Sequence, residues 1–263
     1  MQRLEFTHSS ELRLQQAVRN HSYTLRILPG DDPAQQVRIT SCVVRPAQEH
    51  SLQEDGFGNR LFIGSCTRPH DRFGYEVSGT AVVDAAKGRG SACSVLFTCS
   101  SPLCVPGPAL HALAAEGAAP AAASGPQAVF SRAQQLCAFV YDAMEYVPGS
   151  TSVATTAEQA AAQRTGVCQD YAHVLAVLLR MEGIPARYIC GLMIGEGATH
   201  AWVEFFDGQT WWGLDPTNNC EAGDFYIVLA RGRDHSDCPM ERGVFRGGAM
   251  QRLKTQVQVS VVD

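Results

Sequence analysis

The stretch from Pro102 to Pro126 constrains the fold most, because the chain has different hydrophobic periods on its two sides. It is rich in Ala, Pro and Gly and carries almost no charge. Such a composition is typical of a mobile connection that cannot specify a core of its own. The sequence therefore predicts a β-rich domain at 1–101, a connection at 102–126 and a second domain at 127–263.

Short segments with the composition of β-strands occupy the first hundred residues. They are LEFTH (4–8), SYTLRIL (22–28), VRITSCVV (37–44), RLFIGSC (60–66), YEVSGTAVV (75–83) and SVLFTCS (94–100). Turn-forming clusters lie between them, such as the run from Pro29 to Pro33. Strands and turns that alternate at this spacing favour an antiparallel β-sandwich.

Three helices are predicted after the connection. The first follows an apolar face that recurs every three or four residues from Phe130 to Met144. The second is expected over 155–163, because Thr155 and Glu158 form a capping-box pattern. The third is expected from near Gly166 to Gly183, where glycine and a following proline end it.

Strand patterns return after Pro185. They are ARYICGLMI (186–194), THAWVEFF (199–206), TWWGLD (210–215) and DFYIVLA (224–230). Helices followed by antiparallel strands are typical of an α+β domain in which the helices pack on the sheet. The predicted fold class of the whole chain is α+β, with an N-terminal antiparallel β-sandwich-like domain ahead of this core.

Cys168 falls in the first turn of the third predicted helix. A cysteine acts as a nucleophile in its thiolate form, which unpaired N–H groups and the positive end of a helix dipole stabilise. A lone cysteine is nevertheless more often a buried structural thiol than a nucleophile. A base oriented beside it would favour the catalytic interpretation.

The dipeptide Asp207-Gly208 predicts a two-residue hairpin turn between THAWVEFF and TWWGLD. A regular hairpin closed by this turn places His200 opposite Asp215. Opposed residues have Cβ atoms about 4.5 to 5.5 Å apart, close enough for a carboxylate to bind an imidazole N–H. The hairpin therefore predicts a histidine base oriented by an aspartate, and Cys168 is the candidate nucleophile. A β-bulge would shift this register.

Four segments of the second half resemble the transglutaminase-like superfamily. They are TGVCQDYAH (165–173), GIPARY (183–188), THAWVE (199–204) and WGLDPT (212–217). The first half, including DGFGN at 55–59, resembles the β-rich N-terminal region of bacterial members. The resemblance covers nearly the whole chain and keeps the family's order of Cys, His and Asp.

The resemblance implies a papain-like core in which Cys168 attacks an amide or peptide carbonyl. His200 would exchange protons, and Asp215 would orient the histidine. The thioester would then be released to water or to an amine, because family members include peptidases, deamidases and protein crosslinkers. The chain lacks acidic clusters like the calcium loops of animal transglutaminases, so calcium activation is not expected.

The oxyanion of such a reaction needs hydrogen-bond donors. One is expected from the backbone N–H of the nucleophile itself. The resemblance suggests Tyr146 as a second donor, and the analogy with papain-like proteases suggests Gln163. The residues expected to support the turn of the cysteine follow it directly in the motif, and they are Gln169, Asp170 and Tyr171.

Composition and charge bear on partners and location. A net charge of -5 without blocks of like charge disfavours nucleic acid and anionic membranes as partners. Neither a secretion signal nor an apolar stretch long enough to span a membrane is visible. The ten cysteines lack C-x2-C zinc spacing and are expected to be mostly reduced. We expect a cytoplasmic protein with no metal or cofactor and with a peptide or protein substrate, and the oligomeric state stays open.

Three functions stay open on the sequence. The leading hypothesis is a cysteine hydrolase, a peptidase or amidase, that uses water as the acyl acceptor. The second is a protein-glutamine amine transferase, and the third is a binding or assembly module without catalysis. Nothing in the residues separates water from an amine, because that partition depends on the shape and dryness of the groove.

Overall fold

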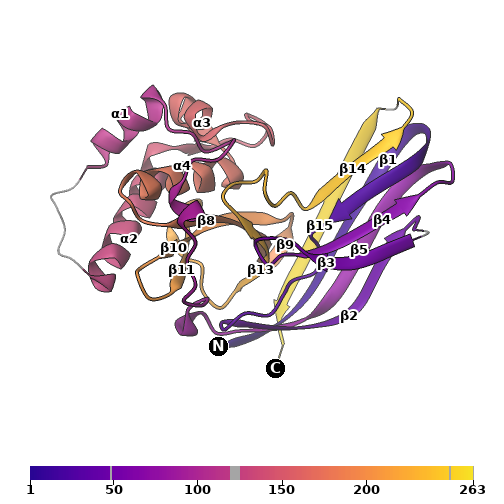
Figure 1. Cartoon of the computed structure of the whole chain (residues 1–263), viewed down its shortest axis with the longest axis horizontal. Helices are drawn as coiled ribbons and strands as arrows, with labels where there is room; N and C mark the ends of the chain where they lie inside the picture. Colours follow the sequence, from indigo (N-terminus) through magenta and orange to yellow (C-terminus); the bar gives the residue numbers. More distant parts are fainter. Residues whose placement is uncertain (48, 119–124, 249, 263) are drawn as a thin grey trace.

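The computed structural model of the chain describes residues 1–47, 49–118, 125–248 and 250–262. It contains an eight-stranded antiparallel sheet, a five-stranded antiparallel sheet and a group of helices. Figure 1 shows the large sheet at one end of the molecule, the helices at the other end and the five-stranded sheet between them. The predicted α+β fold class is confirmed.

The long strand β1 (Gln2–Leu25) organises the large sheet, and it joins two segments that the sequence predicts as separate strands. Its even-numbered residues from 4 to 14 are buried and the odd-numbered residues between them are not, as expected for a strand with one buried face. The other strands of this sheet are β2 (Gln35–Arg45), β3 (Glu49–Glu54), β4 (Arg60–Cys66), β5 (His70–Val83), β9 (Gly195–Gly197), β14 (Glu241–Arg246) and β15 (Gln251–Val261).

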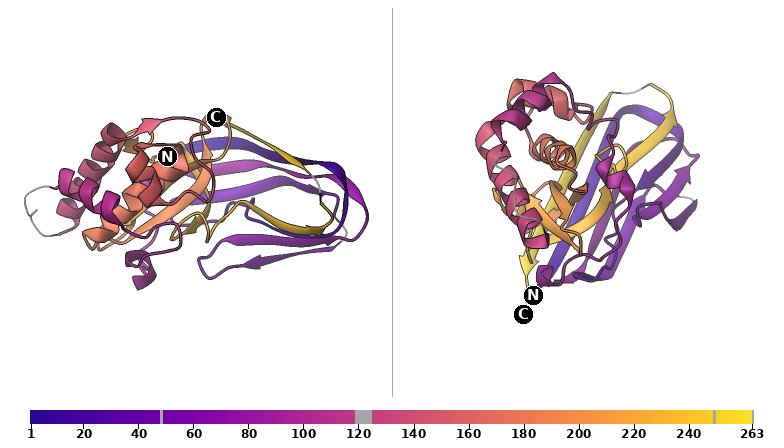
Figure 2. Two further views of the ribbon diagram at one scale, coloured as in Figure 1. Left: turned by 90° about the horizontal axis from the view of Figure 1, so that it is seen from above. Right: turned by 60° about the vertical axis from the view of Figure 1, so that its left-hand side comes forward.

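The last strands of the chain differ from the predicted division into domains. β14 and β15 both pair with β1, and Leu4 lies opposite Val261. Figure 2 shows the yellow C-terminal strands beside the indigo N-terminal one. Residues assigned to the domain 127–263 thus complete the N-terminal sheet, because pairing between strands so far apart in sequence leaves no local signal.

The predicted connection at 102–126 also differs in part from the structure. Residues of this stretch form helix α1 (Pro108–Glu116), and Leu110 and Leu113 are fully buried in the helical core. Two apolar side chains one turn apart are enough to dock a short helix, even where composition suggests a connection. Residues 119–124 of this prediction lie outside the described residues.

The three predicted helices are confirmed as α2 (Pro126–Ala143), α3 (Ala157–Gln163) and α4 (Cys168–Met181). The capping box of α3 is formed by Thr156 and Gln159, one residue beyond the predicted pair. Glu158 instead accepts hydrogen bonds of 2.7 to 3.1 Å from three backbone N–H groups at the start of α1. A carboxylate there satisfies helix N–H groups that have no partner in their own helix.

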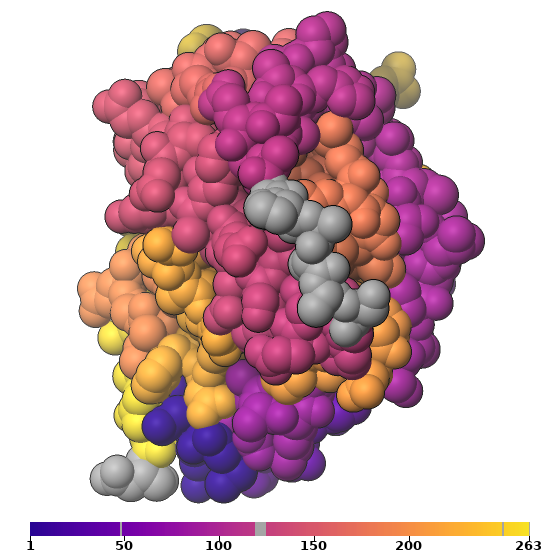
Figure 3. All heavy atoms as spheres, turned by 90° about the vertical axis from the view of Figure 1, so that its left-hand side faces the viewer, coloured from indigo at the N-terminus to yellow at the C-terminus, as the bar shows by residue number. Residues whose placement is uncertain are grey.

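Helix α4 is the centre of the second half, and every residue from Asp170 to Arg180 is buried. It contacts α2 and α3 as well as β8 (Ala186–Met193) and β10 (His200–Phe206). Figure 3 views the molecule from the helical end, where α1, α2 and α3 in magenta and pink form much of the surface. None of the helices in the described ranges is long and apolar enough to cross a bilayer.

The five-stranded sheet has the order β12-β11-β10-β8-β13. Its remaining strands are β11 (Trp211–Asp215), β12 (Cys220–Glu221) and β13 (Tyr226–Gly232). The expected strand at 94–100 is wrong, since residues Val95–Thr98 form a short 3-10 helix with Ser94 as its cap. The hydroxyl of Ser94 accepts from the N–H of Leu96, a local bond that competes with an extended strand.

A buried chain of charges links loops of the N-terminal half to the five-stranded sheet. Arg89 lies 3.0 Å from Asp32 and 3.1 Å from Glu204. Glu204 is fully buried and also accepts a 2.6 Å hydrogen bond from Arg187. Opposite charges at these distances offset the cost of removing each one from water.

Candidate active site

His200 and Asp215 form a short hydrogen bond. Nε2 of His200 lies 2.7 Å from Oδ2 of Asp215. The histidine side chain is 12% exposed, whereas the aspartate side chain is fully buried. A buried carboxylate therefore holds an imidazole that remains accessible at its other edge.

The predicted pairing of these two residues is wrong, although their contact exists. β10 and β11 pair with Val203 opposite Leu214. In this register the residue opposite Asp215 is Trp202 rather than His200. A shift of two residues along a strand keeps every side chain on its original face. Asp215 therefore reaches His200 along the diagonal between neighbouring pairs.

The turn between these strands explains the shift. It spans four residues, Asp207 to Thr210, instead of the two that were expected. The carboxylate of Asp207 accepts from the N–H groups of Gln209 and Thr210 at 2.7 and 2.8 Å. An aspartate that bonds the backbone ahead of it stabilises a longer turn than the Asp-Gly pair alone suggests.

Asp215 has further partners that sequence reasoning missed. Its carboxylate accepts from the hydroxyl of Tyr226 at 2.9 Å, from the side-chain amide of Asn218 at 2.7 Å and from the N–H of Thr217 at 2.9 Å. Burial raises the pKa of Asp215, but the bonds from His200, Asn218 and Tyr226 outweigh it, so the pKa lies below its ordinary value. Asp215 is therefore ionised beside His200.

Cys168 begins α4, as predicted, and lines the same cavity as His200. Nε2 of the imidazole is occupied by Asp215, so Nδ1 is left for the thiol. Burial lowers the pKa of His200, but the bonds and charges of Asp215 and Cys168 outweigh it and raise the pKa to about 9. This environment favours the imidazolium form of His200 at neutral pH.

Asp170 supports the turn before Cys168. Its Oδ2 accepts from the N–H of Val167 at 2.8 Å and from the hydroxyl of Thr151 at 2.6 Å. A Cβ added to Gly166 would lie 2.5 Å from Cβ of Asp170, so the glycine is needed for this close approach. The close neighbour of Gly166 is therefore this side chain.

The two candidates for a second oxyanion donor lie in different surroundings. Tyr146 pairs with Gly166 across the short strands β6 (Glu145–Tyr146) and β7 (Thr165–Gly166). Burial and the neighbouring Cys168 raise the pKa of Tyr146, but its side chain is 49% exposed and does not line the cavity that contains Cys168. Gln163 is exposed at the end of α3 and does not line the cavity that contains Cys168.

The other motif residues separate into two groups. Gln169 lines the cavity, and its side-chain amide donates to the carbonyl of Val153 at 3.2 Å. Tyr171 is buried in the helical core, with its ring 6.2 Å from the ring of Tyr146. The structure thus brings Gln169 to the site and assigns Tyr171 to the packing beneath it.

A cavity of about 300 Å³ lies between the nucleophile and the large sheet. Cys168 and His200 line one side of it, and His8, Tyr75 and Glu241 line the other. The N-terminal sheet therefore supplies one wall of the candidate site. A larger hollow on that sheet, beside His50 and Val244, contains none of the predicted site residues.

The described part of the chain has no group of three or more His, Cys, Asp or Glu residues that could hold a metal ion. The chemistry that the site can perform with its own side chains is proton transfer and thiol attack. In sequence comparisons, residues 117–216 match the transglutaminase-like superfamily, and residues 4–82 match the bacterial transglutaminase-like N-terminal region. The chain belongs to the transglutaminase-like superfamily.

Relatives within this superfamily differ in how much of the chain they share. An uncharacterized protein of Mycobacterium leprae is 36% identical over 127 residues, which cover 44% of this chain and 45% of that relative. An uncharacterized protein of Mycobacterium bovis is 28% identical over an alignment of 295 positions, which covers 99% of this chain and 90% of the relative. The match thus spans less than half of the first relative.

Two further similarities concern proteins whose names refer to an activity. A protein-glutamine gamma-glutamyltransferase of Pseudomonas aeruginosa is 37% identical over 67 residues, which cover 20% of this chain and 10% of that enzyme. The solved structure of a candidate cysteine protease from Cytophaga hutchinsonii has a TM-score of 0.77 at 21% identity and covers 100% of this chain and 92% of that one. The second similarity shows that the two chains share a fold.

Proposed function

We propose that this protein is a cysteine-nucleophile acyl-transfer enzyme that hydrolyses amide or peptide bonds. The observation that carries the proposal is the 2.7 Å bond between His200 and Asp215 beside the thiol of Cys168. A nucleophile, a base and a group that orients the base are the parts that covalent acyl transfer requires. Membership of the transglutaminase-like superfamily supports the same reaction class.

In the first half-reaction, His200 already holds the thiol proton as the imidazolium, and the sulfur of Cys168 attacks the carbonyl carbon. The C–S bond forms, and the carbonyl oxygen becomes an oxyanion. The N–H groups of Cys168 and Gln169 precede the first hydrogen bonds of α4, in which Asp170 and Tyr171 donate to Val167, so they are suited to bind that oxygen. Collapse of this intermediate breaks the C–N bond, and the leaving amine takes the proton from His200.

In the second half-reaction, water attacks the thioester and His200 accepts its proton. The C–S bond breaks, the acid leaves and the thiol is restored. Asp215 stabilises the imidazolium formed in each half, because its carboxylate stays ionised and bonded to Nε2. Partial exposure of Cys168 and His200 supports access of water to the thioester.

A second candidate function is transfer of the acyl group to an amine. The similarity to the glutamyltransferase of Pseudomonas aeruginosa over 67 residues favours it. The third candidate is a binding module without catalysis, and it gives no function to the buried carboxylate of Asp215 beside His200. An ionised group withdrawn from water is costly to maintain, which favours the catalytic interpretation.

We further propose that the enzyme acts on peptides or proteins in the cytoplasm and does not bind nucleic acid or membranes. All ten cysteines are described by the structure and carry free thiols. Reduced cysteines in this number are typical of a reducing compartment. The net charge of -5 supports the proposal that the protein binds neither nucleic acid nor membranes.

Incubation with labelled peptide libraries tests the proposed reaction. We expect the wild-type protein to form an acyl adduct, seen by intact mass, and to release the acid product. Cys168→Ala should abolish both, whereas Cys42→Ser, which alters an exposed cysteine on β2, should change neither. An adduct that only added amines resolve would support the transferase. No adduct, together with equal alkylation of Cys168 in wild type and His200→Ala, would favour the binding module.

A further inference from the structure

The cavity wall opposite Cys168 carries polar side chains where the strand pattern predicts apolar ones. The inward positions of β1 are apolar at 4, 6, 12 and 14, but positions 8 and 10 are His8 and Ser10. His8 is fully buried and Ser10 is 5% exposed. Because burying polar groups costs free energy unless they are used, this break in the pattern indicates a binding surface.

His8, Tyr75 and Glu241 line this cavity and form a polar wall, and Ser10 supports the wall through Glu241 without lining the cavity itself. Nε2 of His8 lies 3.1 Å from the hydroxyl of Tyr75. The hydroxyl of Ser10 donates to Oε2 of Glu241 at 3.2 Å. Nδ1 of His8 has no hydrogen-bond partner among the described residues, although it is buried. The wall therefore has unused hydrogen-bonding capacity on the cavity that contains the nucleophile.

Glu241 is the charged member of the polar wall, and no ion pair to it is found in the described part of the chain. Arg26, which neighbours its strand, pairs instead with Asp55 at 3.2 Å. Burial raises the pKa of Glu241, against the opposing effect of the bond from Ser10. Burial also lowers the pKa of His8 to about 4, so the imidazole beside it is neutral at neutral pH. The wall thus presents one carboxylate without a counter-charge.

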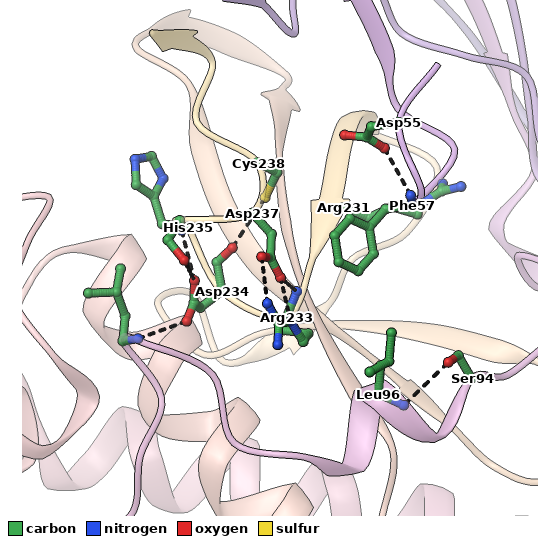
Figure 4. A network of polar contacts seen from close by, with 12 residues as sticks. Asp55, Phe57, Ser94, Leu96, Arg231, Arg233, Asp234, His235, Asp237 and Cys238 are labelled. Carbon is green, nitrogen blue, oxygen red and sulfur yellow. Dashed lines mark hydrogen bonds and ion pairs between the residues drawn. The ribbon is translucent and has the colours of Figure 1, made fainter.

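The loop before Glu241 holds the carboxylate in place. Figure 4 shows this loop, in which Arg233 faces Asp237, with their side chains 2.8 Å apart. Asp234 accepts from the N–H of Leu103 at 2.8 Å, and the thiol of Cys238 donates to the Asp234 carbonyl at 3.5 Å. These contacts fix the loop, and the loop in turn fixes the position of Glu241 in the polar wall.

We propose that the polar wall binds an ammonium group of the substrate beside Cys168, with Glu241 as its charge partner and His8 and Tyr75 as neutral hydrogen-bonding neighbours. The proposal rests on the proposed function for the role of Cys168. An ammonium is a compact charge with several donors, which suits a small cavity lined by acceptors. It can come from a lysine side chain or amino terminus of the acyl donor, or from an amine acceptor.

Thiol probes that differ in charge test the proposal without any turnover. Methanethiosulfonates with an aminoethyl, a methyl or a sulfonatoethyl group would be reacted with the full chain, and the rate at each cysteine read by peptide mass mapping. Cys42, exposed on β2, is the reference thiol in the same molecule. We expect the ratio of the cationic to the neutral rate to be higher at Cys168 than at Cys42.

Glu241→Gln should lower that ratio at Cys168 by about fivefold, the effect of one unit charge at contact distance in a hydrated site. Glu241→Asp keeps the charge and should keep the preference. Glu54→Gln, on the exposed strand β3, should leave the ratio unchanged. A ratio at Cys168 that equals the ratio at Cys42, or that survives Glu241→Gln, overturns the proposal. The wild-type comparison needs no variant, so it decides the matter even where Glu241→Gln does not fold.

Protection of Cys168 from the neutral probe separates the two sources of the ammonium. Protection by propylamine that depends on Glu241 assigns the wall to an amine acceptor. Protection by a lysyl peptide but not by its acetyl-lysine form, without protection by propylamine, assigns it to the acyl donor. Because these readouts need only an accessible thiol, a charge-selective Cys168 in a protein that never hydrolyses a peptide would overturn the proposed function alone.

Discussion

Asp215 lies diagonally across the strand pair from His200, and their 2.7 Å bond is made between neighbouring pairs of the ladder. In the observed strand register, Trp202 and not His200 would lie opposite Asp215. The diagonal bond therefore depends on the other hydrogen bonds that position the carboxylate of Asp215. Asn218 and Tyr226 hold it there, at 2.7 and 2.9 Å.

Asp215→Asn should lower kcat/KM by about 10³-fold or more, because an amide cannot stabilise the imidazolium of His200. The pKa of His200 should fall from about 9 toward its ordinary value of 6.5. Steady-state kinetics and an NMR titration of the imidazole measure the two effects. Asp142→Asn, on the exposed side of α2, is the matched control and should change neither. A pKa that stays near 9 in Asp215→Asn would contradict the assignment.

Tyr226→Phe should have a smaller effect of the same kind. It removes one donor to Asp215 and leaves the bonds from His200 and Asn218, so kcat should fall about tenfold with KM nearly unchanged. Kinetics at saturating and limiting substrate separate the two constants. Tyr141→Phe, an exposed tyrosine of α2, should behave as wild type. A loss confined to KM would mean that Tyr226 contacts substrate instead.

The stability of the protein should depend on pH through His200. Its pKa in the folded state is about 9, above the ordinary value of 6.5 that applies when unfolded. A raised pKa of this kind stabilises the fold fully below about pH 6.5, and the contribution is lost as pH rises through 9. The expected contribution is on the order of 3 kcal/mol.

Urea denaturation of wild type and His200→Gln at pH 6 and pH 9.5 measures this contribution. The difference in the free energy of unfolding between the two proteins should be largest at pH 6 and should shrink at pH 9.5. A difference that grows with pH would show that the imidazole is neutral in the folded protein.

Glu204→Gln should destabilise the fold by about 3 to 5 kcal/mol, because it leaves Arg187 and Arg89 buried with less negative charge beside them. Glu11→Gln breaks an exposed pair with Arg13 and should have a much smaller effect on stability. Chemical denaturation of both variants gives the comparison. Equal losses would mean that the buried chain of charges contributes no more than a surface pair.

The sequence predicts most elements of this fold well, because each has a local signal. The period of the apolar residues predicts α2 and α4, and turn clusters separate the strands of the large sheet. The predictions fail where a side chain makes other contacts, distant or local, than the pattern indicates. Glu158 caps α1 instead of its own helix, and Asp207 lengthens a turn that two residues would otherwise close.

The candidate site shows the same division between near and distant contacts. Cys168, His200 and Asp215 were predicted from a helix start and one hairpin, and the structure brings the three together. Asn218 follows Asp215 in sequence, in a turn pattern that could have indicated it. Tyr226 gives no such signal, because β13 does not adjoin β11 in the sheet.

The sequence by itself determined which residues start the nucleophile's helix and which share the face of the hairpin, since both depend on neighbours a few positions away. Only the tertiary structure decided what faces Cys168 across the cavity. His8 and Glu241 lie at opposite ends of the chain, and β1 brings them together by pairing with β5, β14 and β15. Such pairing is set by the packing of whole faces rather than by any local period, so the role of the N-terminal sheet as a wall of the site emerges only when the chain is folded.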